Sequence, residues 1–445
     1  QYGCDGALRP YAQRAGAAGC RDSCLSGGLL QPAGQRNGQA DKNGEYLLDP
    51  LVFHELAAEK NADQSESWTN MAEDYEKGQV MKICTITCHD VYNVGASLQA
   101  YALQTYLKSL GHDVKIIDYK PDYLSKHYRL DVVGNPKYDK PFVREAYLLA
   151  KLPGRLRALP RKKAFDSFTA KHLDLTRRYV SNEELKADPP EADAFFAGSD
   201  QIWNPLFPNG KDPAFYLDFV QQGVRASYAA SFAVDEFPQE LREVTAQYLS
   251  RFDHIAVRET SGLSVLKTLG ITNAVTVLDP VFLLDRAQWE AMAEKPERCE
   301  KPYLLVYDFD NSPAVRKLAE RIAAERGLHI YAVFKLPYAE RCFPLCGPEA
   351  FLGLMQHADF VLSNSFHATA FSVIFEKEFA VVERTEKINT RMRDFTAMLG
   401  LPDHMVTTET EIPDGTDWTA VYRCLKNEID HAKAYIDEVL RDGEK

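Results

Sequence analysis

A histidine that follows an apolar strand pattern is the first candidate for chemistry. His367 stands in the segment NSFHAT at residues 364–369, where the strand ends in polar residues and a helix continues as far as Phe375. An imidazole can give or take a proton near neutral pH, so His367 is a candidate general acid or base. Ser365, two residues earlier, is a candidate anion ligand. The alternative is a structural histidine that only starts the helix.

Cationic side chains follow two other strand patterns. Arg258 comes directly after the apolar segment 254–257, and a guanidinium there can make a forked contact with a carboxylate or phosphate. A basic cluster follows the segment 379–382 and includes three candidate anion ligands, Arg384, Lys387 and Arg391. The alternatives are a surface ion pair between Arg258 and Glu259 and a solvated face for the cluster.

The segment NVGAS at residues 93–97 lies between the first expected strand and its helix. Backbone N–H groups and the helix dipole can hold an anion at such a position, and Gly95 lets the backbone come close to it. Asn93 and Gly95 are therefore candidate anion-binding residues. In the competing interpretation, Ser97 is the N-cap of the helix and Gly95 only forms the turn.

A polar loop with a tryptophan, GSDQIWNP at residues 198–205, follows another apolar strand pattern. Such a loop suits sugar binding, and its candidate acceptor-binding residues are Ser199, Asp200, Gln201, Trp203 and Asn204. The alternative is an Asx turn with Trp203 packed in the core. Asp279, which precedes Pro280, is expected to fix a turn rather than to act in catalysis.

Alternating strand and helix patterns from Met81 onward place these residues at the ends of strands. A strand, an amphipathic helix and a second strand in succession form a parallel, right-handed unit. The helix is expected over residues 97–110, and the strands over 83–87, 114–119, 194–197, 226–231, 254–257 and 275–278. We assign residues 81–295 to one α/β domain.

A second α/β domain is expected over residues 296–445, after a proline- and charge-rich linker at 294–302. Its strands are predicted at 303–307, 329–334, 360–362 and 379–382, and its helices at 312–325 and 347–356, with a terminal helix at 418–441. Two facing α/β domains bind ligands in the cleft outside the carboxyl ends of their strands.

The leader at residues 1–80 differs from the rest of the chain. It holds ten of the 25 glycines and little apolar periodicity, which is typical of a disordered or loosely helical segment. Met81 directly precedes the first strand pattern and is a candidate natural start. We assign the leader no function.

Composition excludes several classes of protein. The 445 residues carry a formal net charge of -12, so a nucleic-acid partner is not expected. There is no long apolar run and no secretory signal pattern. Nine cysteines without a paired Cys-x-x-Cys motif fit reduced thiols, and no metal site is expected. One basic, leucine-rich stretch at 140–171 could touch an anionic lipid surface, with a solvated insertion as its alternative.

Taken in order, these segments resemble the polysaccharide pyruvyl transferase family. The resemblance runs from Met81 to about Leu401 and excludes the leader. The segments that carry it are YNVGASLQAYAL at 92–103, AGSDQIWN at 197–204, SYAASF at 227–232, AVRE at 256–259, VLDP at 277–280 and NSFHATAF at 364–371.

The resemblance implies two Rossmann-like α/β domains facing a cleft, similar to GT-B glycosyltransferases. It also implies a transferase that moves pyruvate from phosphoenolpyruvate to sugar hydroxyls, forming a ketal and releasing phosphate, with phosphoenolpyruvate as co-substrate and no cofactor. His367 and Arg258 are then the catalytic candidates. Members of the family carry an arginine two residues before this histidine and a glycine after it; here Ser365 and Ala368 stand there. Arg384, Lys387 or Arg391 could supply the missing charge.

The expected partners are a small-molecule donor and a saccharide or lipid-linked saccharide of the cell envelope or exopolysaccharide. The expected location is the cytoplasm, including the inner face of the membrane through peripheral contact of residues 140–171. Two alternatives stay open because of Ser365: a GT-B-like glycosyltransferase that uses a nucleotide sugar, and a non-catalytic paralogue that binds glycan.

Overall fold

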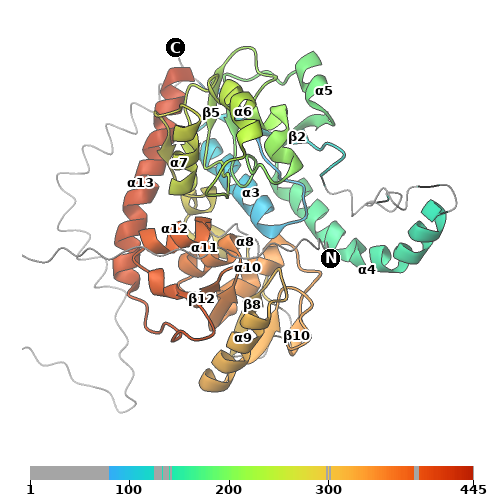
Figure 1. Ribbon diagram of the computed structural model, residues 1–445, viewed down its shortest axis with the longest axis vertical. Helices are drawn as coiled ribbons and strands as arrows, with labels where there is room; N and C mark the ends of the chain where they lie inside the picture. The colour runs from blue at the N-terminus through green and yellow to red at the C-terminus, as the bar shows by residue number, and fades with distance from the viewer. Residues whose placement is uncertain are drawn as a thin grey trace, which may run out of the picture. The chain divides into compact units, whose positions relative to one another are not determined.

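The computed structural model describes residues 80–124, 133, 140, 143–296, 299, 302–384 and 390–443 (Figure 1). The chain divides into two compact units, residues 1–78 and residues 79–445, and all described residues belong to the second. The expected leader therefore lies, apart from Val80, outside the described residues.

A five-stranded parallel sheet forms the first half of the described chain. Its central strands β1 and β4 are short apolar runs that are buried almost throughout, as expected for a parallel sheet covered by helices, whereas the edge strands β3 and β5 are partly exposed. Their order is β3-β2-β1-β4-β5, with β1 Lys82–Ile86, β2 Asp113–Tyr119, β3 Leu175–Tyr179, β4 Ala194–Ala197 and β5 Val224–Ser227. A parallel pair, β6 Ala256–Val257 and β7 Val275–Thr276, follows, and isolated bridges join β6 to the chain after β5.

A six-stranded parallel sheet forms the second half. Its order is β10-β9-β8-β11-β12-β13, with β8 Tyr303–Tyr307, β9 His329–Ala332, β10 Arg341–Cys342, β11 Phe360–Ser363, β12 Glu378–Val382 and β13 Met405–Val406. Both sheets thus have the strand order of a doubly wound nucleotide-binding fold. The expectation of two Rossmann-like α/β halves is confirmed, and in each sheet the order reverses at one point, between β1 and β4 and between β8 and β11.

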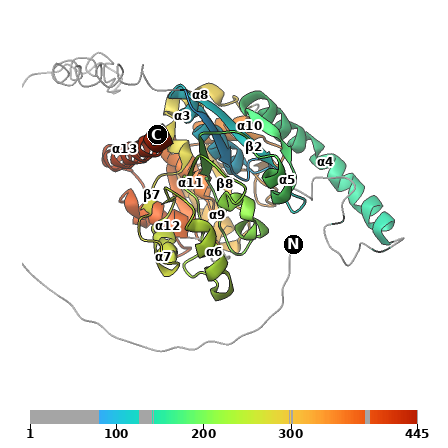
Figure 2. The same cartoon turned by 90° about the horizontal axis from the view of Figure 1, so that it is seen from above.

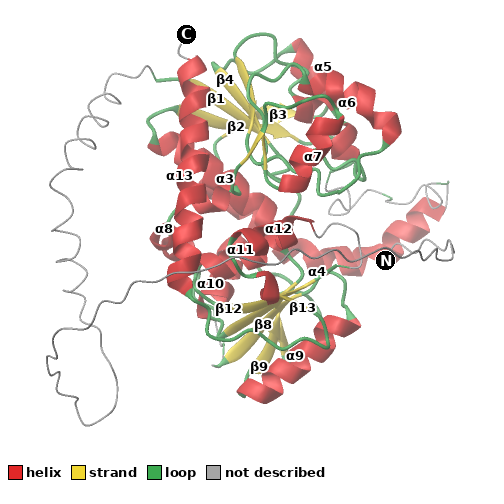
Figure 3. Ribbon diagram, turned by 60° about the vertical axis from the view of Figure 1, so that its left-hand side comes forward, coloured by secondary structure: helices red, strands yellow, loops and turns green. Residues whose placement is uncertain are grey.

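Helices cover both sheets (Figure 3). They are α3 Val94–Ser109, α4 Val143–His172, α5 Asn182–Ala187, α6 Arg242–Leu249, α7 Thr260–Thr268, α8 Arg286–Met292, α9 Pro313–Arg326, α10 Pro348–His357, α11 Phe366–Ile374, α12 Thr390–Met398 and α13 Trp418–Gly443. One apolar core includes residues of both halves, from Leu98 on α3 to Phe371 on α11. The six described cysteines are free thiols.

The C-terminal helix α13 returns to the first half. Its Tyr435 hydroxyl donates to the Ser227 carbonyl at the end of β5, 2.8 Å away, and Asp442 lies 3.0 Å from His254. The sequence pattern assigns this helix to the second domain, which it follows in the chain. Its contacts attach it to the first sheet as well.

The long helix α4 covers most of the basic, leucine-rich stretch at 140–171 and contains Pro153 and Pro160. Proline removes one helical hydrogen bond, so other contacts have to hold this helix together. Its last turns are held by Phe165 and Phe168, which are buried in the core. The first turns extend away from the two sheets (Figure 2).

Candidate functional site

A cavity of about 150 Å³ lies where the carboxyl ends of both sheets meet. Residues that follow β1, β4, β8, β11 and β12 line it, which places it at the switch points of both sheets, where doubly wound folds bind ligands. The lining residues are Asn93, Asp200, Gln201, Phe309, Asn364, Ser365, Phe366, His367, Arg384, Arg391 and Met392. One water molecule needs about 10–15 Å³. The cavity is therefore large enough to accommodate a small molecule.

The N-terminus of α3 forms one wall of the site. Asn93 is the N-cap, and its Oδ1 accepts from the N–H groups of Gly95 at 2.9 Å and Ala96 at 3.3 Å. A Cβ added at Gly95 would lie 2.0 Å from His367 Nδ1. Glycine at this position therefore allows the imidazole to lie directly against the helix backbone. Ser97 is not the N-cap, as the competing interpretation held, but lies within the first turn of α3.

His367 faces a buried carboxylate. Its Nε2 lies 3.6 Å from Asp279 Oδ2, and within the described part of the chain no hydrogen-bond partner satisfies this nitrogen. Arg258 Nη2 lies 3.0 Å from the same oxygen and donates to Ser199 Oγ at 2.7 Å. Burial alone would raise the pKa of Asp279, but Arg258 and then His367 overcome this effect and lower it to about 2. Asp279 is therefore a permanent anion beside the imidazole.

Asp200 joins the two arginines across the cavity. Its Oδ1 lies 3.5 Å from Arg258 Nη1 and 3.3 Å from Arg391 Nη1. Its backbone has φ of 71°, a left-handed conformation that is uncommon outside glycine and frequent at functional sites. Burial opposes ionisation of Asp200, but Arg258, His367 and Arg391 together lower its pKa.

Two arginines of the basic cluster reach the cavity. The Arg391 guanidinium lies 5.7 Å from the Phe366 ring, on which Arg258 also lies at 4.9 Å. Burial, with Arg258 nearby, lowers the pKa of Arg391 to about 10, so it remains a cation at neutral pH. Arg384 lies over Phe309 at 4.9 Å and pairs with Asp310 at 3.1 Å. Lys387, the third candidate, lies outside the described residues.

The loop after β4 divides between the cavity and the core. Asp200 and Gln201 line the cavity. Ser199 is fully buried, and its hydroxyl accepts from Arg258 and donates to the Ala229 carbonyl at 3.0 Å. Trp203 is also fully buried and donates to the Phe215 carbonyl at 3.0 Å. The expectation that Trp203 contacts an acceptor does not fit this position, because the indole packs inside the first half.

Asn204 is a buried residue that makes hydrogen bonds within the same loop. It is fully buried, its Nδ2 donates to Gln201 Oε1 at 2.7 Å, and its Oδ1 accepts from Leu206 N at 3.0 Å. It therefore orients Gln201 rather than lining the cavity itself.

Three side chains outside the set of candidate site residues, Asp279, Asn364 and Glu259, hold the site together. Asp279 caps the turn after it, since its Oδ1 accepts from Val281 N at 3.1 Å, and its other oxygen faces Arg258 and His367. Asn364 bonds Asp308 through Nδ2 at 2.7 Å, which joins the loops after β8 and β11. Their common signal is a polar residue directly after an apolar strand, the same signal that identified Arg258.

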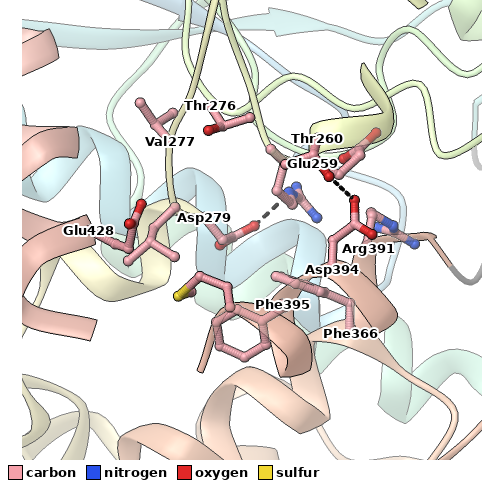
Figure 4. Close-up of a pocket in the computed structure, with 13 residues that line it drawn as sticks. Glu259, Thr260, Thr276, Val277, Asp279, Phe366, Arg391, Asp394, Phe395 and Glu428 are labelled. Carbon is pink, nitrogen blue, oxygen red and sulfur yellow. Dashed lines mark hydrogen bonds and ion pairs between the residues drawn. The ribbon is translucent and has the colours of Figure 1, made fainter. Parts of the chain in front are cut away.

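Glu259 is the third of these residues. Its Oε1 accepts from the Ser231 hydroxyl at 2.9 Å and from Ala233 N at 3.0 Å, and burial raises its pKa. It borders a second cavity of about 70 Å³, which shares Phe366 and Arg391 with the first (Figure 4). The surface ion pair between Glu259 and Arg258, the alternative interpretation of Arg258, is not among the contacts of the described residues, because Arg258 pairs with Asp279 and Asp200 instead.

Replacing Gly95 by alanine is expected to lower kcat by about 10²-fold. The added Cβ would overlap His367 Nδ1, so the imidazole must move by about 1 Å or more, and a displacement of that size costs this much if His367 is the acid or base of the reaction. The measurement is kcat with a soluble acceptor, beside the melting temperature. Gly154→Ala is the matched control, because it lies in a helix with no atom within 4 Å of an added Cβ. Unchanged kcat in Gly95→Ala would contradict the contact.

Comparison with known families identifies the chain. The family described as polysaccharide pyruvyl transferase matches residues 93–386, more than half of the chain and all of the cavity residues except Arg391 and Met392. The chain therefore belongs to the polysaccharide pyruvyl transferase family, and the protein is a transferase. No curated protein sequence matches it significantly.

Solved structures resemble it only distantly. A glycosyltransferase from Rickettsia africae has a TM-score of 0.41 and 10% identity, covering 83% of this chain and 100% of its own. UGT89C1 of Arabidopsis thaliana has a TM-score of 0.42 and 10% identity, covering 82% and 100%. A UDP-GlcNAc 2-epimerase from Methanocaldococcus jannaschii has a TM-score of 0.35 and 13% identity, covering 78% and 92%.

Proposed function

We propose that the protein transfers pyruvate from phosphoenolpyruvate to two hydroxyls of a cell-envelope or exopolysaccharide sugar. The observation that carries this proposal is the wall of the cavity. Guanidinium groups of Arg384 and Arg391 and the imidazole of His367 face a space large enough for a small molecule, and Arg258 lies directly behind them. Phosphoenolpyruvate carries a phosphate and a carboxylate, the two groups that arginine forks bind best.

The chemistry requires one carbon to be protonated and one phosphate to leave. A proton added to the methylene carbon of the donor turns that carbon into a methyl group and leaves the neighbouring carbon electrophilic. A first sugar hydroxyl attacks there, phosphate departs, and a second hydroxyl completes the ketal. The two hydroxyl protons balance the reaction, since one replaces the proton given to the methyl group and the other leaves with phosphate.

His367 is our candidate for moving these protons. Its Nε2 has no hydrogen-bond partner among the residues that the structure describes, and the Asp279 carboxylate lies 3.6 Å away. The ring is fixed from behind by the Gly95 backbone. A base that is oriented by a neighbouring anion can take a hydroxyl proton and later return it as an acid. Arg258, held by Ser199 and Asp279, lies where it can stabilise charge that develops on the departing phosphate.

Arg391 is our candidate for the charge that Ser365 lacks. Replacing Arg391 by alanine is expected to raise the KM for phosphoenolpyruvate about 10- to 100-fold, the usual effect of losing a hydrogen bond to a charged group. Initial rates at varied donor concentration measure it. Arg393→Ala is the matched control, because it lies on the same helix but pairs with Asp235 at the surface. Unchanged donor affinity in Arg391→Ala would show that this arginine does not replace the family's residue.

A donor screen tests the proposed function. The protein is incubated with phosphoenolpyruvate and a panel of β-galactosyl and N-acetylhexosamine acceptors, and phosphate release is followed. We expect release that requires both donor and acceptor. Thermal stabilisation by nucleotide sugars without any response to phosphoenolpyruvate would contradict the proposal and favour a glycosyltransferase. Glycan binding without turnover of either donor would favour a non-catalytic protein.

A further inference from the structure

The first turns of α4 are an exposed, basic and leucine-rich segment. They extend away from both sheets in two perpendicular views (Figures 1 and 2). Large apolar side chains lie open to solvent along them, with exposed fractions of 69% for Leu149, 48% for Leu156 and 38% for Leu159. A water-soluble surface rarely gathers large apolar groups in this way unless something covers them.

These leucines form a stripe on the side of α4 that faces away from the core. Leu148, Leu149, Leu152, Leu156 and Leu159 recur at helical spacing. Sixteen residues separate Leu149 from the buried Phe165, and the same number separates Leu152 from the buried Phe168. At 3.6 residues per turn this places each pair about 160° apart around the helix axis. The buried side of α4 thus faces the protein, and the leucine stripe faces outward.

The same segment is strongly basic in an acidic protein. Residues 143–163 carry seven Lys and Arg against one Glu, whereas the whole chain has a net charge of -12. A helix with cations on one side and leucines on the other is the composition of helices that lie in the interface of an anionic bilayer. The cations require a partner with negative charge, and the leucines require an apolar layer beneath that charge. An anionic lipid bilayer has negatively charged headgroups above an apolar interior, so it matches both the cations and the leucines of α4.

The inner end of α4 lies beside the active-site cavity. Arg161 donates to the Tyr92 carbonyl at 3.1 Å and to the Cys346 carbonyl at 3.2 Å, which attaches the helix to both halves. Tyr92 also donates to Asp166 at 3.2 Å and immediately precedes Asn93, the residue that lines the cavity. A surface bound by α4 would therefore lie close to the site.

We propose that the leucine stripe of α4 and its flanking cations dock the protein on an anionic lipid bilayer. Leu149, Leu156 and Leu159 enter the interface, and Lys151, Arg157 and their basic neighbours contact lipid phosphates. This position presents the cavity to a sugar that is linked to a lipid in the same membrane. The lipid-linked nature of the acceptor rests on the proposed function, whereas the docking itself does not.

Flotation with vesicles tests the docking. The full chain is mixed with vesicles of phosphatidylcholine alone or of phosphatidylcholine with phosphatidylglycerol. We expect binding to the anionic vesicles only, weakened in 1 M salt because the screening length falls to about 3 Å. The Leu149→Asp/Leu156→Asp and Lys151→Glu/Arg157→Glu variants are each expected to lose at least about tenfold in affinity. Lys267→Glu/Lys426→Glu makes the same change in charge at exposed sites elsewhere and is expected to bind like the unmodified chain.

Three outcomes would overturn the proposal. They are no binding to anionic vesicles, equal binding to neutral ones, and full binding by both α4 variants. A change from dimer to monomer in Leu149→Asp/Leu156→Asp, without vesicle binding by the parent, would instead make the stripe an interface between two copies of this chain. Phosphate release with a soluble acceptor separates the two proposals, since α4 variants are expected to keep it whether or not vesicles bind.

Discussion

Replacing His367 by asparagine is expected to lower kcat for pyruvyl transfer by about 10²- to 10⁴-fold, the usual contribution of a positioned general acid or base. Asparagine keeps a polar group of similar size against Gly95 and Asp279 but cannot exchange a proton near neutral pH. The measurement is phosphate release under saturating donor and acceptor. Because we propose that arginines bind the donor, the KM for phosphoenolpyruvate is expected to change far less than kcat.

His431→Asn is the control for this prediction. His431 lies exposed on α13, and its replacement is expected to leave kcat and KM unchanged. In the smaller variant His367→Ala, added imidazole is expected to restore part of the rate, because the removed ring leaves space beside Asp279. A His367→Asn protein with full kcat would show that another group moves the protons.

Replacing Arg258 by methionine is expected to abolish measurable activity and to destabilise the fold by about 3–5 kcal/mol. The side chain of Arg258 is almost fully buried and balances two carboxylates, the fully buried Asp279 and the partly exposed Asp200. Removing one partner of a buried ion pair leaves the remaining charge uncompensated, at a cost of that size. Chemical denaturation measures the loss at neutral pH. Arg286→Met, at a half-exposed pair with Glu290 and Glu376, is expected to cost less than about 1 kcal/mol.

The destabilisation by Arg258→Met is expected to depend on pH. In the parent protein the pKa of Asp279 falls from 3.8 to about 2 on folding, so this carboxylate stabilises the fold above pH 3.8 and loses that effect as the pH falls towards 2. Without Arg258, the largest favourable influence on Asp279 disappears and burial raises its pKa. The difference in stability between parent and variant should therefore be largest at neutral pH and shrink in acid. A constant difference from pH 4 to pH 7 would contradict this role of Arg258.

The strands and the main candidates of the site were predictable because their signals are local. A buried parallel strand such as β8 is a continuous apolar run, and its carboxyl end is marked by the first polar residue. His367, Arg258 and Asp200 follow strands in this way, and the structure brings all three around Asp279. The ends of the helices were harder to predict than their presence. The helix expected over residues 97–110 begins at Val94, because Asn93 and not Ser97 accepts from its first N–H groups.

The remaining features depend on contacts between distant segments. Asp279 was predicted only to fix a turn, and nothing near it in the sequence indicates that Arg258 and His367 meet at its second oxygen. The sequence around Trp203 fits either an exposed anchor for a sugar or a core residue. The hydrogen bond from its indole to the Phe215 carbonyl, which decides for the core, joins it to a residue 12 positions away. The helix α4 survives two prolines because Phe165 and Phe168 anchor it in the core.

Transfer from phosphoenolpyruvate in deuterated water tests the central claim most directly. The acceptor that supports phosphate release is converted in D₂O, and the product is analysed by NMR spectroscopy. If the donor carbon is protonated by an exchangeable group such as His367, the ketal methyl carries one deuterium and one phosphate is released per ketal. A sugar product without a new methyl group, or consumption of a nucleotide sugar while phosphoenolpyruvate stays intact, would contradict the account.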